Sequence, residues 1–93
     1  MTSEPSETLV KHNLEQTRFE TGDGAYLSYA HEGDRVVFGH TYVPPHLRGK
    51  GVAAILARAA LTEARNRNWK IVPACSYVAT FIDRYPEFKD LLA

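Results

Sequence analysis

The chain has 93 residues, enough for one small domain. Its 11 basic and 11 acidic residues cancel, which argues against a general attraction to nucleic acid or to an anionic membrane surface. The single cysteine, Cys75, excludes an intrachain disulfide, and the sequence shows neither a run of about 18 apolar residues nor a signal-peptide pattern. We therefore expect a cytoplasmic protein without a membrane span.

The first half of the chain predicts strands that are separated by short glycine-containing turns. Residues 1–7 are polar and are expected to be flexible. Alternation is weak over Thr8–Glu20, where we expect a short strand that ends at Arg18–Glu20. Tyrosine and β-branched residues indicate two stronger strands, Ala25–His31 and Arg35–Val43. Pro44 and Pro45 end the last of them, because proline cannot donate to a strand ladder.

The second half predicts a helix, a strand and a second helix. The first helix is expected over Gly51–Arg65, the strand over Trp69–Pro73, and the second helix over Ser76–Tyr85, with a last turn over Phe88–Leu92. Five apolar residues of the first helix share one predicted side: Val52, Ile55, Leu56, Ala59 and Ala60. Hairpin-linked strands followed by a strand-helix-strand unit indicate an α+β fold, a mostly antiparallel sheet with two main helices packed on it.

The segment Arg48–Ala53 joins the strongest predicted strand to the first predicted helix. Its two glycines allow close approach to a helix N-terminus, where unpaired N–H groups and nearby cations favour a phosphate-bearing ligand. The Walker phosphate-loop pattern does not fit. The dinucleotide-binding pattern is met by Gly49, Gly51 and Ala54, but Pro44–Leu47 intervene and no acidic residue lies about 20 positions on. The remaining alternative is a glycine-rich connection between strand and helix that binds no ligand and exposes its cations to solvent.

Arg48–Ala53 resembles the acyl-CoA-binding signature of the GNAT acetyltransferase superfamily. His40–Pro44 upstream and Pro73–Val78 downstream are similar to segments of a small, single-domain GNAT-like family, and the resemblance extends over residues 12–91. It implies a minimal GNAT-like fold, with residues 1–93 as one acyl-CoA-binding domain and acetyl-CoA as the acyl donor. It also implies that the diphosphate and thioester of CoA lie against a set of nine residues: Tyr42, Val43, Leu47, Arg48, Gly49, Lys50, Gly51, Val52 and Ala53.

The sequence departs from larger relatives in two ways. Those enzymes carry two helices between their first two strands, which help to shape the acceptor site, whereas only Thr21–Gly24 joins the strands here. We therefore expect a more open acceptor site. Larger members also often use a tyrosine of the second helix to protonate the leaving thiolate. Ile82 occupies that place and cannot donate a proton, so another group must do so.

Two side chains are candidates for catalysis, Cys75 and His40. The cysteine precedes the second predicted helix, where a thiolate is favoured and can accept an acyl group; the alternative is a small buried hydrophobic side chain. His40 has a pKa suited to a general base; the alternative is a hydrogen-bonded strand histidine. Strict alternation places it with Phe38 and Tyr42, opposite Thr41, unless a bulge changes the register. Tyr77 is a candidate acid, although packing is the favoured interpretation.

These observations predict an acetyl-CoA-dependent N-acetyltransferase that acts on an amine of a small molecule or a protein, by direct transfer or through an acyl-cysteine at Cys75. The alternative is a non-catalytic acyl-CoA-binding module. The other histidines, His12, His31 and His46, lack partners at metal-ligand spacing, so no metal site is predicted. No nucleic-acid or membrane partner is expected, and we expect a monomer or a weak dimer.

Overall fold

The computed structural model describes residues 9–93, so the predicted flexible start at residues 1–7 lies outside the described residues. Five strands form one sheet whose spatial order follows the sequence. The first four pair antiparallel, and the fifth pairs parallel with the fourth. The strands are β1 (Lys11–Asn13), β2 (Arg18–Glu20), β3 (Tyr26–Glu32), β4 (Arg35–Tyr42) and β5 (Lys70–Val72).

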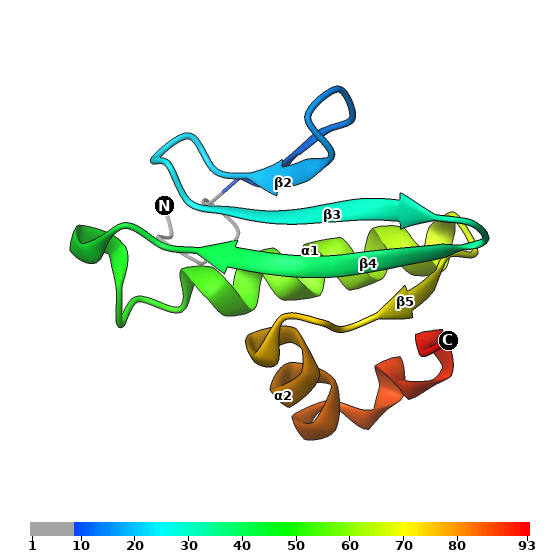
Figure 1. Cartoon of the computed structure of the whole chain (residues 1–93). Helices are drawn as coiled ribbons and strands as arrows, with labels where there is room; N and C mark the ends of the chain where they lie inside the picture. The colour runs from blue at the N-terminus through cyan, green and yellow to red at the C-terminus, as the bar shows by residue number, and fades with distance from the viewer. Residues whose placement is uncertain (1–8) are drawn as a thin grey trace.

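Within residues 9–93, two helices and two 3₁₀ turns accompany the sheet. They are η2 (Pro45–Leu47), α1 (Val52–Asn66), α2 (Ser76–Arg84) and η3 (Pro86–Leu91). Helix α1 runs behind the sheet, while α2 and η3 lie beyond the β5 edge and contact α1 (Figure 1). Within residues 9–93, no helix covers the opposite face of β3 and β4, which we call the open face. The predicted α+β class, with a mostly antiparallel sheet and two main helices, is confirmed.

The stretch Thr8–Glu20 contains two strands where the sequence predicted one. β1 and β2 pair as a hairpin, and residues 14–17 form the turn between them. The Asn13 side-chain oxygen accepts the Gln16 N–H at 3.0 Å, and Thr17 has a positive φ of 50°. The turn therefore depends on a local asparagine side-chain bond, which the weak alternation of this stretch did not reveal.

A β-bulge in β4 overturns the predicted grouping of Phe38 with His40 and Tyr42. His40 pairs with Ser28, but Phe38 pairs with Tyr29, so Gly39 is the extra residue between them. An extra residue shifts the alternation by one. Phe38 consequently points into the core with no exposed surface, whereas His40 and Tyr42 are exposed on the open face.

Helix α1 presents a core side that differs in part from the predicted one. Val52, Leu56 and Ala60 are buried as expected, together with Ala57, Leu61 and Ala64. Ile55 and Ala59 are only half-buried, because they line a surface groove of about 640 Å³ between α1, α2 and residues 9–10. The longest helix has 15 residues, and no helix in the described part of the chain is both long and apolar enough to cross a membrane.

Candidate acyl-CoA site

The segment Arg48–Ala53, which we call the glycine loop, leads into the N-terminus of α1, and no side chain caps that helix. Gly49 and Gly51 both have a φ of +80°, a left-handed conformation that only glycine adopts without strain. Gly51 is the N-cap of α1, and no side chain caps that end. The first helical bond runs from the Ile55 N–H to the Gly51 carbonyl, at 3.1 Å. The three N–H groups between them, at residues 52–54, therefore have no helical partner and are free to bind an anion.

A shallow cavity of about 160 Å³ lies in front of this helix end. Nine residues line it: Val43, Leu47, Arg48, Gly49, Gly51, Val52, Ala53, Ala54 and Tyr77. Seven of these belong to the nine residues that the resemblance implied; Tyr42 and Lys50 do not line it. No heavy atom lies within 4 Å of the position that a Cβ would take at Gly49 or Gly51. The space before the backbone is thus open to a ligand.

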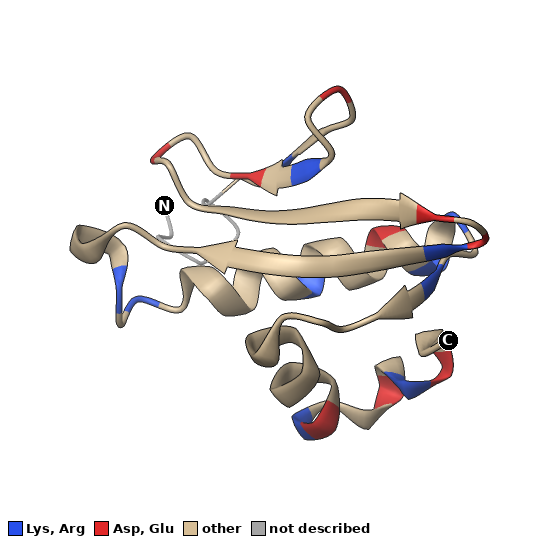
Figure 2. Ribbon diagram, in the orientation of Figure 1, with Lys and Arg blue, Asp and Glu red and all other residues tan. Residues whose placement is uncertain are grey.

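Two cations flank the cavity. Arg48 is exposed, and its Nε donates to the Val43 carbonyl at 3.0 Å, which leaves its terminal nitrogens available. Lys50 is exposed on the same loop. The blue segments before α1 mark the basic residues of this loop (Figure 2). Uncapped N–H groups, left-handed glycines and two cations match the chemistry of a diphosphate, so the residues present fit that part of CoA.

A gap between β4 and the chain that follows β5 adjoins the cavity. The last parallel pair of these strands is Val37 with Val72. One further bond, from the Cys75 N–H to the Phe38 carbonyl at 2.9 Å, holds the two segments together. Beyond it, within the described chain, no backbone bond joins residues 39–43 to residues 73–77. The strands separate there, so unpaired backbone groups of β4 become available to an extended ligand.

Cys75 lies at the start of this gap. It is the N-cap of α2, and its sulfur lies 3.4 Å from the Thr41 hydroxyl. Partial burial acts to raise the pKa of the thiol, but this effect is outweighed by the Thr41 hydroxyl and the N–H groups of Val78 and Tyr77, so the pKa lies below its ordinary value. The N–H groups act electrostatically, because no capping hydrogen bond of ordinary geometry forms. The thiolate of Cys75 is therefore easier to form than that of an ordinary cysteine.

The second predicted catalytic residue, His40, is not brought to Cys75. The bulge at Gly39 turns His40 to the open face, whereas Thr41 points toward the cysteine. Thr41 is the site residue that the sequence analysis missed. Its place in the His40–Pro44 segment was a signal, but no pattern in the sequence shows that it contacts Cys75.

Tyr77 and Ile82 clarify the missing acid. Tyr77 is exposed and lines the cavity, and partial burial raises the pKa of its hydroxyl, which keeps the O–H protonated near neutral pH. Ile82 is buried in the core with 2% exposure, so its position does not face a ligand.

Among residues 9–93 no group of three or more His, Cys, Asp and Glu side chains is placed to hold a metal ion.

Comparison with known proteins agrees with this geometry. The family described as GCN5-related N-acetyl-transferase matches residues 8–91. This chain belongs to the GCN5-related N-acetyltransferase family. Human Protein NATD1 is 37% identical over 83 residues, covering 83% of this chain and 74% of the human protein. The mouse Protein NATD1 is 32% identical over 83 residues, covering 83% of this chain and 76% of its own length.

A solved structure of similar fold comes from Staphylococcus aureus. The NMR solution structure of a GCN5-like protein superimposes on this chain with a TM-score of 0.74 and 26% identity. The superposition covers 95% of this chain and 90% of that one. The predicted membership of a small GNAT-like family is thus confirmed, and acyl transfer is supported at the level of the GCN5-related family.

Proposed function

We propose that this protein is an acetyl-CoA-dependent N-acetyltransferase of the cytoplasm that acts on an amine. The observation that carries the proposal is the uncapped start of α1 beside a gap at which a polarised thiol, Cys75, is held by Thr41. Membership of the GCN5-related family supports the reaction class.

The donor substrate has a defined place in this proposal. The diphosphate of acetyl-CoA lies on the N–H groups at residues 52–54, with Arg48 and Lys50 neutralising its charge. Its thioester arm extends along the edge of β4 that is free beyond Phe38. A backbone N–H near Tyr42–Val43 stabilises the charge that develops on the thioester oxygen.

The transfer proceeds in two steps in this proposal. The Cys75 thiolate attacks the thioester carbonyl carbon, forms a new carbon–sulfur bond and expels the CoA thiolate, which takes a proton from the Tyr77 hydroxyl or from water. A neutral amine then attacks the acetyl-cysteine, the carbon–sulfur bond breaks, and Cys75 leaves as a thiolate. The surplus proton of the amine passes to water, because His40 lies on the opposite face of β4 from Cys75. In direct transfer, the amine attacks acetyl-CoA itself.

Release of free CoA from acetyl-CoA, measured with a panel of amines and peptides, tests the proposal. We expect release that depends on the amine, and an acetyl group on Cys75 by mass spectrometry when no amine is present. Cys75→Ala separates the routes, because unchanged turnover would eliminate the acyl-cysteine and leave direct transfer. Thr80→Ala, an exposed change on the same helix, serves as the control.

The second candidate is a non-catalytic acyl-CoA-binding module. Larger relatives often carry the acid tyrosine at the place of Ile82. Ile82 is buried and cannot donate a proton, and this loss of the usual acid favours a module without turnover. Calorimetric binding of CoA with no release of free CoA for any amine, and with no acetylated Cys75, would establish this module and refute the transferase.

A further inference from the structure

The open face carries three rings in one contiguous group. Tyr26 on β3 pairs directly with Tyr42 on β4, and Ser28 pairs with His40. The Tyr26 ring centroid lies 5.6 Å from that of Tyr42 and 5.9 Å from that of His40. Because residues two apart on a strand share a face, all three rings point the same way. We call Tyr26, His40 and Tyr42 the aromatic platform.

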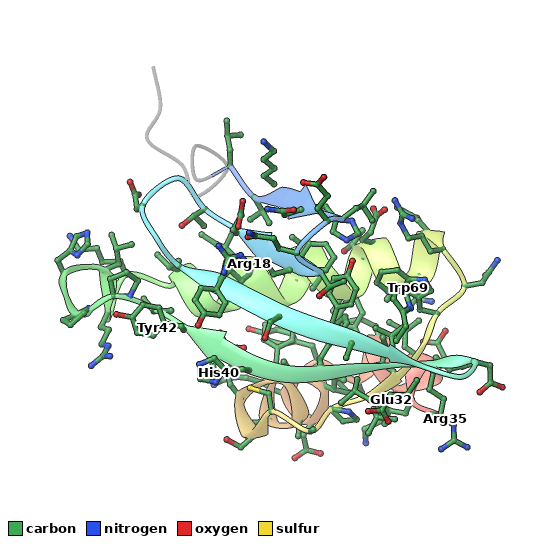
Figure 3. All side chains as sticks on the ribbon, turned by 45° about the horizontal axis from the view of Figure 1, so that its top comes forward. Arg18, Glu32, Arg35, His40, Tyr42 and Trp69 are labelled. Atoms are coloured by element: carbon green, nitrogen blue, oxygen red, sulfur yellow. The ribbon has the colours of Figure 1, made fainter. Side chains whose placement is uncertain are left out.

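The aromatic platform is accessible and adjoins the acyl-CoA site. Tyr42 is 38% exposed, an unusual exposure for a large ring, and His40 is exposed as well. His40 and Tyr42 flank Thr41, whose side chain passes to the other side of β4 and meets Cys75. Figure 3 shows Tyr42 and His40 toward the glycine-loop end of the strands, far from Trp69. The platform and the thiol therefore lie on two sides of the same short stretch of β4.

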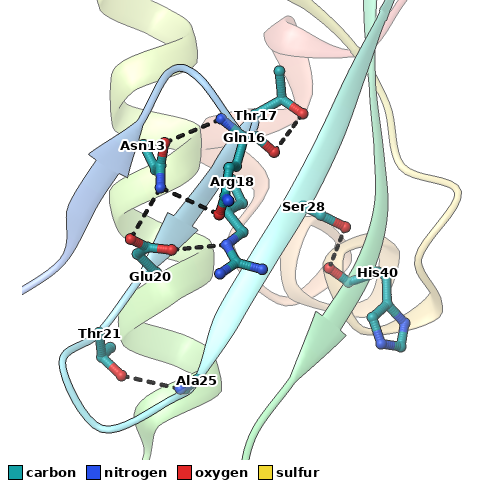
Figure 4. A network of polar contacts seen from close by, with 9 residues as sticks. All are labelled: Asn13, Gln16, Thr17, Arg18, Glu20, Thr21, Ala25, Ser28 and His40. Atoms are coloured by element: carbon teal, nitrogen blue, oxygen red, sulfur yellow. Dashed lines mark hydrogen bonds and ion pairs between the residues drawn. The ribbon is translucent and has the colours of Figure 1, made fainter.

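The charges around the aromatic platform restrict what can bind. The Arg18 guanidinium lies 4.9 Å from the Tyr26 ring centroid, so one cation already contacts these rings. Glu20 has both carboxylate oxygens engaged, one by the Arg18 Nε at 2.7 Å and the other by the Asn13 amide at 3.2 Å (Figure 4). The strand residues next to the platform on this face are uncharged, namely Ser28, Ala30, Val37 and Gly39, and the charged pair Glu32 and Arg35 lies at the far end of the two strands. A polycation therefore meets no free carboxylate next to the platform.

We propose that the aromatic platform binds the acceptor, and that the acceptor is a monoamine with a flat aromatic body. Its ring lies over Tyr26 and Tyr42, and its amine extends past His40 toward the gap at Cys75. Aromatic rings pair well with tyrosine, and a ring without further charge suits a platform whose neighbouring acid, Glu20, is already paired with Arg18. The inference deepens the proposed transferase function and rests on it for the role of the amine as substrate.

Kinetics with matched amines test the inference on the full chain. 2-Phenylethylamine should exceed n-hexylamine in kcat/KM by about tenfold, and spermidine should be the poorest of the three. Tyr42→Leu should abolish the preference through a KM that rises for 2-phenylethylamine and not for n-hexylamine, whereas Tyr42→Phe should retain it. Tyr85→Leu removes the tyrosine that follows the last residue of α2, away from the platform, and should leave the preference intact. Melting temperatures verify that each variant is folded.

Binding measured without turnover separates this inference from the proposed function. In ¹⁵N NMR spectra recorded with CoA present, 2-phenylethylamine should shift the amides of Tyr26, His40 and Tyr42. Such shifts, in a protein that releases no CoA from acetyl-CoA with any amine, would support the platform and refute the transferase. The platform would be overturned as an acceptor site if the Tyr42 variants left the amine preference unchanged or if spermidine bound more strongly than 2-phenylethylamine. It would also be overturned if an oligothymidine shifted these amides and the amine did not.

Discussion

The two ends of the sheet differ in how many of their polar and aromatic groups are engaged in contacts with one another. At the end near Trp69, the His12 Nε2 lies 2.6 Å from the Tyr29 hydroxyl, and the His12 ring stacks on Phe19 at 4.1 Å. The ring centroids of Trp69 and Tyr29 lie 5.2 Å apart. We call these four residues the closed cluster. At the glycine-loop end, the helix N–H groups and the edge of β4 lack such partners within residues 9–93, and the His40 and Tyr42 rings are exposed.

The contrast shows where a small domain has room for function. β3 contributes Tyr29 to the closed cluster and Tyr26 to the open face, so one strand provides packing and a candidate binding surface. Mutual contacts in the closed cluster stabilise the fold and occupy the side chains that make them. The groups that lack partners, at the other end, are the ones that a substrate can satisfy.

The largest expected effect is on stability, from Phe19→Ala in the closed cluster. Phe19 is 2% exposed, and truncation of a buried phenylalanine costs about 3–5 kcal/mol. Urea denaturation should show this loss, while calorimetry on the remaining folded protein should show CoA affinity within about twofold of the original, because the two ends are separate. Phe19→Leu should lose far less stability. A large change in CoA affinity would mean that the two ends are coupled.

Gly51→Ala should affect both stability and CoA binding. The left-handed conformation at φ +80° costs a non-glycine residue about 1–2 kcal/mol. Its Cβ would also project into the open space before the helix N–H groups, and we expect CoA affinity to fall about tenfold. Isothermal titration measures the affinity. The control is Gly22→Ala, which is not left-handed and meets no atom, and equal losses for both variants would contradict a site at Gly51.

Thr41→Val should slow the alkylation of Cys75. The Thr41 hydroxyl stabilises the thiolate, so its loss raises the pKa of Cys75 and should reduce the rate with iodoacetamide at pH 7 by about tenfold. Mass spectrometry follows the alkylated fraction over time. Thr80→Val, a control on the exposed side of α2, should react at the original rate. Identical rates for the two variants would show that Thr41 does not activate the thiol.

The smallest expected effect is a pH dependence of stability from His12. Burial lowers the pKa of His12 below its ordinary 6.5, Arg67 lowers it further, and Glu63 opposes both. The unfolded chain therefore binds more protons than the folded one once the pH falls to about 6.5. Stability is complete above that pH, falls as the pH drops toward the depressed folded pKa, and then levels off.

Thermal melting at pH 7.5 and at pH 5 tests the role of His12. The melting temperature should fall slightly less in His12→Gln than in the original protein, because the glutamine does not titrate. Leu14→Gln introduces the same side chain at a position with 57% exposure, in the adjoining turn, and should keep the full pH dependence. An unchanged pH dependence in His12→Gln would assign the effect to other groups.

Much of the fold was predictable because local chemistry specifies it. Pro44 and Pro45 were expected to end a strand, and Gly49 and Gly51 were expected to lead into a helix, and both expectations are met. The nine residues implied for CoA remain a prediction, although seven of them line one cavity. Two features were not predictable in this way. The β1–β2 turn depends on an asparagine side chain, and the faces of β4 depend on the bulge at Gly39.

The sequence by itself determined the order of elements, the glycine loop and the resemblance that placed the chain in its family, because each depends on residues adjacent along the chain. The tertiary structure decided which residues meet across long separations. Thr41 and Cys75 are 34 positions apart, and the contact exists because β4 and β5 pair and then separate. One extra residue in β4 then turns His40 away from that thiol and onto the open face, since strand side chains alternate with every residue.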